Sequence, residues 1–307
     1  MIFHDDFPTT EAEFDARFAN EDACWEYLVS RRWPEGFACP RCKSTRACLV
    51  GGRLFQCSDC RRQTSVTAGT VFHGTHKPLR TWFRAAFYMT ALKTGVSAKS
   101  LGKLLGLTYK VAWAWTHKLR AAIGERPKEP LQGPVEVDEA FVGGHEPGMP
   151  GRSRGKKSVV LVAAENRGLP TGRVRLQAVP SDSADSLTPA VVKNVTAGAT
   201  VRTDKFWGYK RLTKNDFKHI VEASGRKEAS RNFPHVHRVI SLLKRVLLGT
   251  YQGAVSAGHL QAYLDEFVFR FNRRRTKSPV MIAGSLLALA ITTGPRPYRS
   301  LVLSKGS

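Results

Sequence analysis

Two closely spaced cysteine pairs constrain the fold of this chain more than any other feature. Cys39 and Cys42 are separated by two residues, Cys57 and Cys60 repeat that spacing, and 14 residues lie between the pairs. Such pairs let four thiolates reach one tetrahedral Zn²⁺, while the segment between them folds back as a hairpin. Because sulfur fills all four positions, the zinc would be structural and would leave no place for a catalytic water. The spacing predicts a zinc ribbon over residues 37–75.

The other two cysteines fall outside this pattern. Cys24 lies beside Trp25 in an N-terminal helical segment, residues 1–36, and is expected to be a small buried residue. Cys48 is expected in the hairpin of the ribbon, and neither cysteine is assigned to the metal. A redox-active Cys-x-x-Cys pair is the alternative interpretation of the two pairs.

The chain is strongly basic. Its 307 residues include 48 Lys and Arg against 25 Asp and Glu, which gives a net charge of +23. Such a charge attracts polyanions and gives nucleic acid a sequence-independent affinity that weakens as salt rises. The alternative is a ribosome-associated or merely soluble basic protein.

No membrane partner is expected, because no apolar run approaches the roughly 20 residues that span a bilayer. The first residues, Met-Ile-Phe-His-Asp-Asp-Phe-Pro, lack the basic and apolar blocks of a signal peptide. We therefore expect a cytoplasmic, nucleoid-associated protein whose thiols stay reduced.

A helical region is predicted over residues 78–124. Ser97 suits an N-cap, and leucines at helical spacing follow it as far as Gly106, which would end the first helix. Thr108 begins a second helix with Lys110 near its exposed start. Two short helices joined by a glycine-containing turn favour a helix-turn-helix whose second helix enters a major groove. An ordinary helical hairpin with an aromatic core is the alternative.

Beyond a proline-rich linker over residues 125–134, the pattern changes to strands. Three strands, a helix and then alternating strands and helices are expected within residues 135–280. This layout predicts an α/β, RNase H-like domain with a mixed five-stranded sheet and flanking helices. Residues 281–307 are expected to form a C-terminal tail, poorly ordered from Gly294. The predicted elements are strands at 134–142, 159–165, 174–179, 200–204 and 218–222, helices at 185–195, 234–248 and 256–271, and a basic, glycine-rich loop at 148–157 that suits phosphate contact or is only a flexible hairpin tip.

Three positions in this region suit a second metal site. Asp138 lies at the centre of an alternating strand, Asp204 ends a later apolar run, and His237 begins a helix-like stretch. Two acids on strands and a ligand on a later helix can converge at one edge of a sheet. Such a site suits Mg²⁺ or Mn²⁺, and a metal pair there activates a nucleophile and stabilises the leaving oxygen of phosphoryl transfer. In so basic a chain the expected phosphodiester is DNA or RNA.

Five motifs in a fixed order make a family resemblance specific. They are Cys-Pro-Arg-Cys with Cys-Ser-Asp-Cys, Val-Glu-Val-Asp-Glu-Ala-Phe-Val-Gly-Gly, Arg-Thr-Asp-Lys-Phe-Trp-Gly-Tyr, His-Val-His-Arg-Val-Ile-Ser-Leu-Leu-Lys-Arg and Tyr-Leu-Asp-Glu-Phe-Val-Phe-Arg-Phe-Asn-Arg-Arg. On these motifs, which span residues 39–274, the chain resembles bacterial insertion-sequence transposases of the zinc-ribbon, RNase H-like (DDE) superfamily. The resemblance implies a DDE-type transposase that acts on the ends of its own mobile element.

The resemblance implies a catalytic set with one departure from the family pattern. Asp138 and Asp204 match the two acids of the family, whereas the third position, Glu in most members, is His237. Lys244 lies 7 positions further on, so its side chain shares a helix face with His237. Neutral imidazole binds Mn²⁺ through nitrogen but suits Mg²⁺ less well than a carboxylate. Either the chain has a working triad of two acids and one histidine, which we favour, or it is a weakened or inactive enzyme.

Several neighbours compete with this set. His235 is a rival ligand to His237. Glu139 is an outer or alternative ligand, because neighbouring strand residues point to opposite faces. Glu222, Asp265 and Glu266 are less suitable substitutes, and the last two fit an amphipathic helix.

The implied reaction is transposition. The ribbon and the helix-turn-helix would bind the double-stranded terminal inverted repeats, and metal-dependent strand cleavage would precede strand transfer into target DNA. Lys244 would hold a phosphate beside the scissile bond, and Trp207 and Tyr209 would either stack on a splayed base or pack in the core. Pairing two element ends implies a homodimer or a larger assembly on DNA. The alternative functions are a catalytically inactive DNA-binding regulator and an RNase H-fold nuclease.

Overall fold

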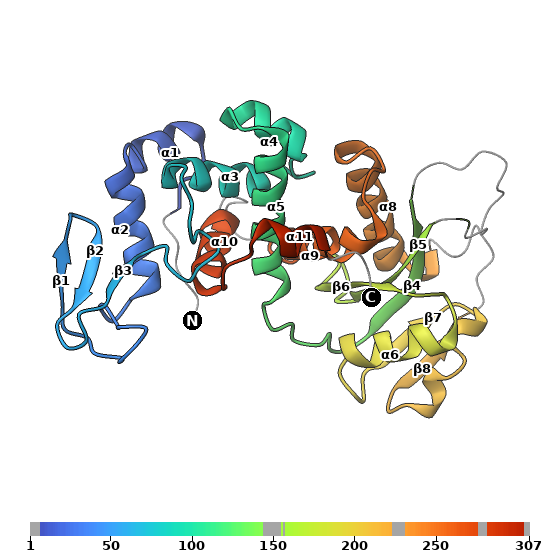
Figure 1. Cartoon of the computed structure of the whole chain (residues 1–307). Coiled ribbons are helices and arrows are strands. Elements are labelled where there is room, and N and C mark those ends of the chain that lie inside the picture. Colours follow the sequence, from blue (N-terminus) through green and yellow to red (C-terminus); the bar gives the residue numbers. More distant parts are fainter. Residues whose placement is uncertain (1–6, 144–154, 156, 223–230, 276–280, 304–307) are drawn as a thin grey trace. The chain divides into compact units, whose positions relative to one another are not determined.

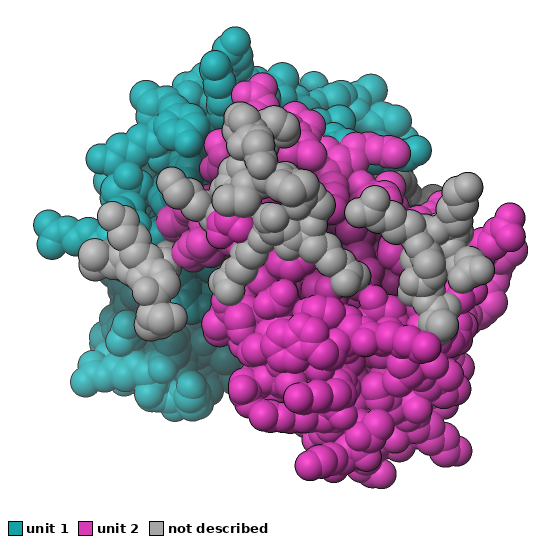
Figure 2. Space-filling view, turned by 90° about the vertical axis from the view of Figure 1, so that its right-hand side faces the viewer, with its two compact units in different colours: residues 1–126, 275–303 teal, residues 127–274, 304–307 magenta. Residues whose placement is uncertain are grey.

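The chain forms two compact units, which we describe separately. A computed structural model describes residues 7–143, 155, 157–222, 231–275 and 281–303. Unit 1 consists of Met1–Arg126 together with Arg275–Leu303, and unit 2 contains Pro127–Arg274 (Figure 2). No helix in the described ranges is long and apolar enough to cross a bilayer.

Unit 1 begins with two capped helices that support a small sheet. Thr10 forms a capping box with Glu13 at the start of α1 (Glu11–Arg17), and the Asn20 side chain accepts from the backbone at the start of α2 (Glu21–Arg32). The strands β1 (Ala47–Val50), β2 (Leu54–Cys57) and β3 (Gln63–Ser65) form an antiparallel sheet in that order. Trp25 of α2 stacks on Phe55 of β2 with ring centroids 5.7 Å apart, so an aromatic contact joins the helix to the sheet.

Three more helices follow, and their ends are set by local capping. They are α3 (Leu79–Ala91), α4 (Ala98–Leu105) and α5 (Tyr109–Gly124). Ser97 and Thr108 each accept a backbone N–H as N-caps, and Gly106 ends α4 in the left-handed conformation with φ 62°. The predicted starts of α4 and α5 and the predicted end of α4 are therefore confirmed. Gly102 of α4 lets the following turn pack close to the helix, because a side chain at this position would place its Cβ 2.9 Å from the Leu107 carbonyl oxygen.

The C-terminal segment returns to unit 1. Where we expected a tail over residues 281–307, the structure forms α10 (Met281–Thr292) and α11 (Tyr298–Leu303). Helix α10 contacts α2, α3 and α5 (Figure 1). Its Leu286, Leu287 and Ala290 are fully buried. A helix that is apolar all round, as Met-Ile-Ala-Gly-Ser-Leu-Leu-Ala-Leu-Ala-Ile-Thr is, forms where other helices surround it, which explains the difference from a tail.

Unit 2 is built on a mixed five-stranded sheet, as predicted. Its strands are β4 (Val135–Val142), β5 (Ser158–Glu165), β6 (Val174–Val179), β7 (Thr200–Thr203) and β8 (Lys218–Val221), arranged in the order β6-β5-β4-β7-β8. The first three form an antiparallel meander, whereas β7 pairs in parallel with both β4 and β8. The strand boundaries follow the sequence pattern closely. The basic loop expected over residues 148–157 lies outside the described residues, apart from Gly155 and Lys157.

Helices cover both faces of this sheet. On one face, alternate strand residues such as Val160 and Val162 pack with α8 (Pro234–Arg245) and α9 (Leu260–Asn272). On the other, Val159 and Leu161 pack with α6 (Ala184–Asn194). Because both faces of β5 are covered, its run of apolar residues is buried throughout. The remaining short helical elements are Trp207–Tyr209, Leu212–Lys214, Val246–Thr250 and Ala257–His259.

Candidate functional site

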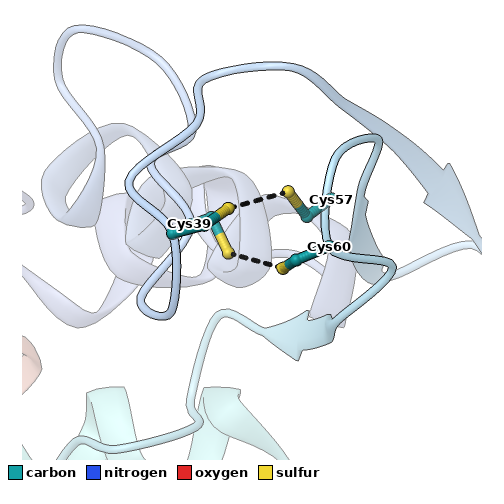
Figure 3. Close-up of side chains that lie close together, drawn as sticks. Cys39, Cys57 and Cys60 are labelled. Carbon is teal, nitrogen blue, oxygen red and sulfur yellow. Dashed lines mark hydrogen bonds between the residues drawn. The ribbon is translucent and has the colours of Figure 1, made fainter.

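The four paired cysteines converge at one point of unit 1. Their sulfur atoms all lie within 4.8 Å of one another. Cys39 Sγ is 3.6 Å from Cys60 Sγ, and Cys42 Sγ is 3.5 Å from Cys57 Sγ, so each close contact joins the two pairs (Figure 3). Four sulfur ligands in a closed cluster are the donor set of a structural zinc site.

Both cysteine pairs sit on the same kind of turn. In the first, the Lys43 N–H donates to the Cys39 carbonyl oxygen and Lys43 has φ 64°. In the second, the Arg61 N–H donates to the Cys57 carbonyl oxygen and Arg61 has φ 58°. The left-handed residue after each second cysteine tightens the turn, and this brings both sulfurs of a pair to one side.

Backbone hydrogen bonds prepare the first sulfur of each pair for a cation. The N–H of Cys42 lowers the pKa of the Cys39 thiol to about 6, against the opposing effect of burial. The N–H of Cys60 likewise lowers the pKa of Cys57. Because zinc binds the thiolate form, N–H groups aimed at sulfur favour the ligand state, and the cysteine set fits Zn²⁺.

The two other cysteines lie where we expected them. Cys24 is fully buried in α2, and burial raises the pKa of its thiol to about 12, which makes it unreactive. Cys48 is exposed in β1 of the ribbon sheet.

In unit 2, strand register brings the two predicted acids alongside each other. Strands β4 and β7 pair in parallel, with Val135 opposite Val201 and Glu136 opposite Arg202. Extending that register places Asp138 beside Asp204, which directly follows β7. Neighbouring strands lie about 4.8 Å apart, so Asp138, in the middle of β4, and Asp204, just past the C-terminal end of β7, come close together.

His237 approaches Asp138 from α8. Its Nε2 lies 3.9 Å from Asp138 Oδ2, and the imidazole is about two-thirds buried, with 35% of its side chain exposed. Burial lowers the pKa of His237, while the charges of Glu136 and Asp204 act to raise it. The ring is therefore neutral near pH 7, which is the form that binds a metal. Because strand register places Asp204 beside Asp138, the three predicted residues lie in one neighbourhood.

A third carboxylate, which sequence reasoning missed, fixes this arrangement. Glu136 is fully buried on β4, two residues before Asp138 and on the same face. Its Oε2 accepts the backbone N–H groups of His235, at 2.9 Å, and Val236, at 3.0 Å. These donors belong to the first turn of α8, where N–H groups lack partners within the helix. Glu136 therefore fastens the start of α8 to β4. The only sequence signal is an acid at a buried strand position.

The turn after Asp204 is equally constrained. Asp204 Oδ1 accepts the Phe206 N–H at 2.9 Å. A Cβ at Gly208 would lie 2.6 Å from the Asp182 carbonyl oxygen, so the backbone approach there requires glycine. The buried Tyr209 donates its hydroxyl to Glu139 Oε2 at 2.9 Å, whereas Trp207 is 54% exposed. Tyr209 thus packs in the core and Trp207 does not.

The competing residues have other partners. Glu139 lies on the α6 side of the sheet with Tyr209, opposite Asp138, as strand alternation predicts. His235 is buried, and its Nδ1 lies 2.9 Å from Thr171 Oγ1. The three acids expected to be poor substitutes form ion pairs: Glu222 with Arg202, Asp265 with Lys128 and Glu266 with Arg270. Lys244 is exposed on α8, with 7 positions separating it from His237.

The Asp138, Asp204 and His237 side chains are less tightly clustered than the four cysteines. Within the described residues, only the four cysteines lie close enough together to hold an ion as they stand; the ligand atoms of Asp138, Asp204 and His237 are further apart. Asp138, Asp204 and His237 supply two carboxylates and one imidazole, a donor set that fits a divalent cation.

Comparison with known proteins identifies the family of this chain. A family model for the ISXO2-like transposase domain matches residues 130–272, and a model for the transposase zinc-ribbon domain matches residues 19–63. The chain therefore belongs to the zinc-ribbon transposases of insertion sequences. It is 30% identical over 277 residues to a protein of Halobacterium salinarum described as an uncharacterized protein in transposable element ISH50, an alignment that covers 82% of this chain and 91% of that protein.

Proposed function

We propose that this chain is a DNA transposase that binds the terminal inverted repeats of its insertion sequence and cuts and joins DNA at Asp138, Asp204 and His237. The observation that carries the proposal is the 3.9 Å approach of His237 Nε2 to Asp138 Oδ2, beside the strand end that bears Asp204. The catalytic domain is then of the RNase H-like type, and the strand order β6-β5-β4-β7-β8 supports it.

The donor set indicates which cation the site would take. Carboxylates of Asp138 and Asp204 are hard oxygen donors that suit Mg²⁺ or Mn²⁺, and the neutral His237 shifts the preference toward Mn²⁺. Divalent ions at such a site supply Lewis acidity to the attacking and leaving oxygens of a phosphodiester. The protein's own contribution is to fix the two carboxylates by strand pairing and the imidazole through the Glu136 contact. Lys244 adds a positive charge on α8 that favours the substrate phosphate.

DNA binding is assigned to unit 1. We propose that α4 and α5 act as a helix-turn-helix, with the exposed start of α5 at Tyr109 and Lys110 facing the major groove. The zinc ribbon adds a second, rigid surface on the same unit. Pairing two element ends implies a dimer or a larger assembly on DNA.

A cleavage and joining assay tests the proposal. Purified protein is mixed with labelled DNA from the region flanking its gene and with a target plasmid, in Mg²⁺, Mn²⁺ or chelator. Metal-dependent nicking at one position and joined product are expected from the native chain and from neither Asp138→Ala nor Asp204→Ala. Nicking without joining would instead indicate a nuclease.

His237 itself favours a second candidate, an inactivated transposase that acts as a DNA-binding regulator. Two variants separate the candidates. If the native chain binds its end DNA without forming either product while His237→Glu forms both, the natural histidine has disabled the enzyme. If the native chain is active and His237→Ala is not, the histidine is a working ligand.

A further inference from the structure

Acidic residues are absent from most of unit 1. No Asp or Glu occurs between Cys60 and Gly124, and none follows Glu266 to the end of the chain. These stretches contain α3, α4, α5, α10 and α11, all of them in unit 1. Arg80 and Arg84 of α3 pair with Asp15 of α1, whereas the charged residues of α4, α5 and α11 are all Lys or Arg. A face of this kind fits a polyanion.

Helix α11 packs directly on the start of α5. The Tyr298 ring lies under the Lys110 ammonium group, with 4.8 Å between Nζ and the ring centroid, and its edge meets Trp113 at 6.0 Å. Leu301, one helical turn later, is buried. Arg299 and Ser300 lie between these two contacts and are exposed. Helix α11 therefore packs Tyr298 and Leu301 against the rest of unit 1 and exposes Arg299 to solvent.

The charges on this face are not neutralised locally. Lys99 and Lys103 on α4, Lys110 on α5 and Arg299 on α11 are exposed and form no ion pair with another described residue. Arg296, by contrast, pairs with Glu125 at the end of α5. Glu125, the acid that follows α5 in the chain, is thus occupied, and the four cations remain available to an external anion.

We propose that α11 is a third DNA-contacting element, which extends the α4–α5 surface along the same duplex. Arg299 contacts a backbone phosphate, and Tyr298 holds the Lys110 ammonium group in place beside it. Contacts of this type position a duplex without reading its sequence. The inference rests on the proposed function, in which α4 and α5 bind the element's end.

The contact between α11 and α5 has an opposite interpretation, in which α11 covers α5 and must leave before DNA binds. Charge argues against it. A covering segment that competes with DNA is expected to bear acids that imitate phosphate, whereas α11 and its flanks bear only cations.

Binding of a fluorescently labelled duplex from the flanking DNA tests the proposal. Anisotropy is measured from about 50 to 200 mM salt with the full chain, Arg299→Ala and Lys193→Ala, and with a scrambled duplex of the same length. Lys193 is a matched control because it is an exposed cation on α6 of unit 2. Loss of one phosphate contact is expected to weaken Arg299→Ala on both duplexes equally and to reduce its salt slope by about 1. Lys193→Ala is expected to match the native chain.

Variants of Tyr298 provide a second test of the proposal. Tyr298→Phe retains the ring under Lys110 and is expected to bind like the native chain, while Tyr298→Ala is expected to weaken binding on both duplexes. Tighter binding by Tyr298→Ala would overturn the proposal in favour of a covering helix. Unchanged affinity and slope for Arg299→Ala would also overturn it. If the native chain binds neither duplex, the proposed DNA-binding function itself fails, and that result is distinct from any effect of the Arg299 and Tyr298 variants.

Discussion

His237 Nε2 and Asp138 Oδ2 lie 3.9 Å apart although the two residues come from a late helix and an early strand. The buried carboxylate of Glu136 explains how this distance is maintained. It shares a strand face with Asp138 and accepts two N–H groups from the first turn of α8, the turn that contains His237. One side chain therefore joins the two halves of the proposed site.

Replacing Glu136 with Gln is the first prediction. The substitution removes the charge that raises the pKa of His237, so that pKa should fall further below its ordinary value. Two hydrogen bonds to a charged acceptor also weaken, at a cost of about 1–3 kcal/mol in unfolding free energy. NMR titration of His237 and urea unfolding measure both effects.

Glu139→Gln is the matched control for that variant. Glu139 is also buried on β4, but it accepts from Tyr209 on the opposite side of the sheet. It should lose stability without moving the titration of His237. Equal titration curves for Glu136→Gln and the native chain would contradict the role assigned to Glu136.

Protonation of His237 should destabilise the fold. Burial lowers the pKa of this residue below the ordinary value of 6.5, so the unfolded chain binds the proton more readily than the folded chain does. The contribution of His237 to stability is therefore fully present above its unfolded-state pKa of 6.5 and is lost as the pH falls below that value. The slope from this residue is below about 1.4 kcal/mol per pH unit. Because His219 has a lowered pKa of the same cause and sign, the difference between the native chain and His237→Asn isolates the effect. An identical pH dependence in the two proteins would show that burial does not disfavour the imidazolium.

Metal removal should unfold the ribbon and leave unit 2 intact. The sheet of β1, β2 and β3 has few buried apolar residues of its own, so the four sulfur ligands supply much of its stability. One zinc per chain is expected by elemental analysis, and Cys60→Ala should lose it. Cys48→Ala is the control, because Cys48 is exposed outside the cluster. Full zinc content in Cys60→Ala would contradict the four-cysteine site.

Much of this architecture is predictable from local sequence. The rest depends on contacts between residues far apart in the chain, which local sequence does not reveal. Features set by residues close in the chain are predictable: the cysteine spacing, the helix caps Ser97 and Thr108, and the alternation of β4. The Glu136 contact joins positions 99 residues apart, and no local pattern shows which buried acid faces which helix end. Helix α10 is apolar on every side, so its sequence indicates burial but not the helices that bury it.

Removing the C-terminal segment should disrupt unit 1, although that segment follows the catalytic domain in the sequence. Deletion of residues 281–307 exposes the surfaces of α2, α3 and α5 that α10 covers. Loss of several fully buried leucine-sized side chains costs about 2–5 kcal/mol each, enough to exceed the stability of a typical domain. Limited proteolysis should then cleave within residues 7–126, and ending the chain at Gly294, which keeps α10, should preserve protection. Resistance of the longer deletion to protease would show that unit 1 folds without its C-terminal helix.

The turn after Asp204 provides the last prediction, because its glycine has no room for a side chain. In Gly208→Ala the new Cβ would meet the Asp182 carbonyl oxygen at 2.6 Å and Leu187 Cδ1 at 2.8 Å. The backbone must shift, at a cost of about 1–3 kcal/mol, and Asp204 moves with it because its Oδ1 accepts the Phe206 N–H within the same turn. Gly249→Ala is the control, since nothing lies within 4 Å of a Cβ there. Urea unfolding and metal-dependent strand cleavage should both decline for Gly208→Ala and stay near native for Gly249→Ala. Cleavage at the native rate in a destabilised Gly208→Ala would separate this turn from the position of Asp204.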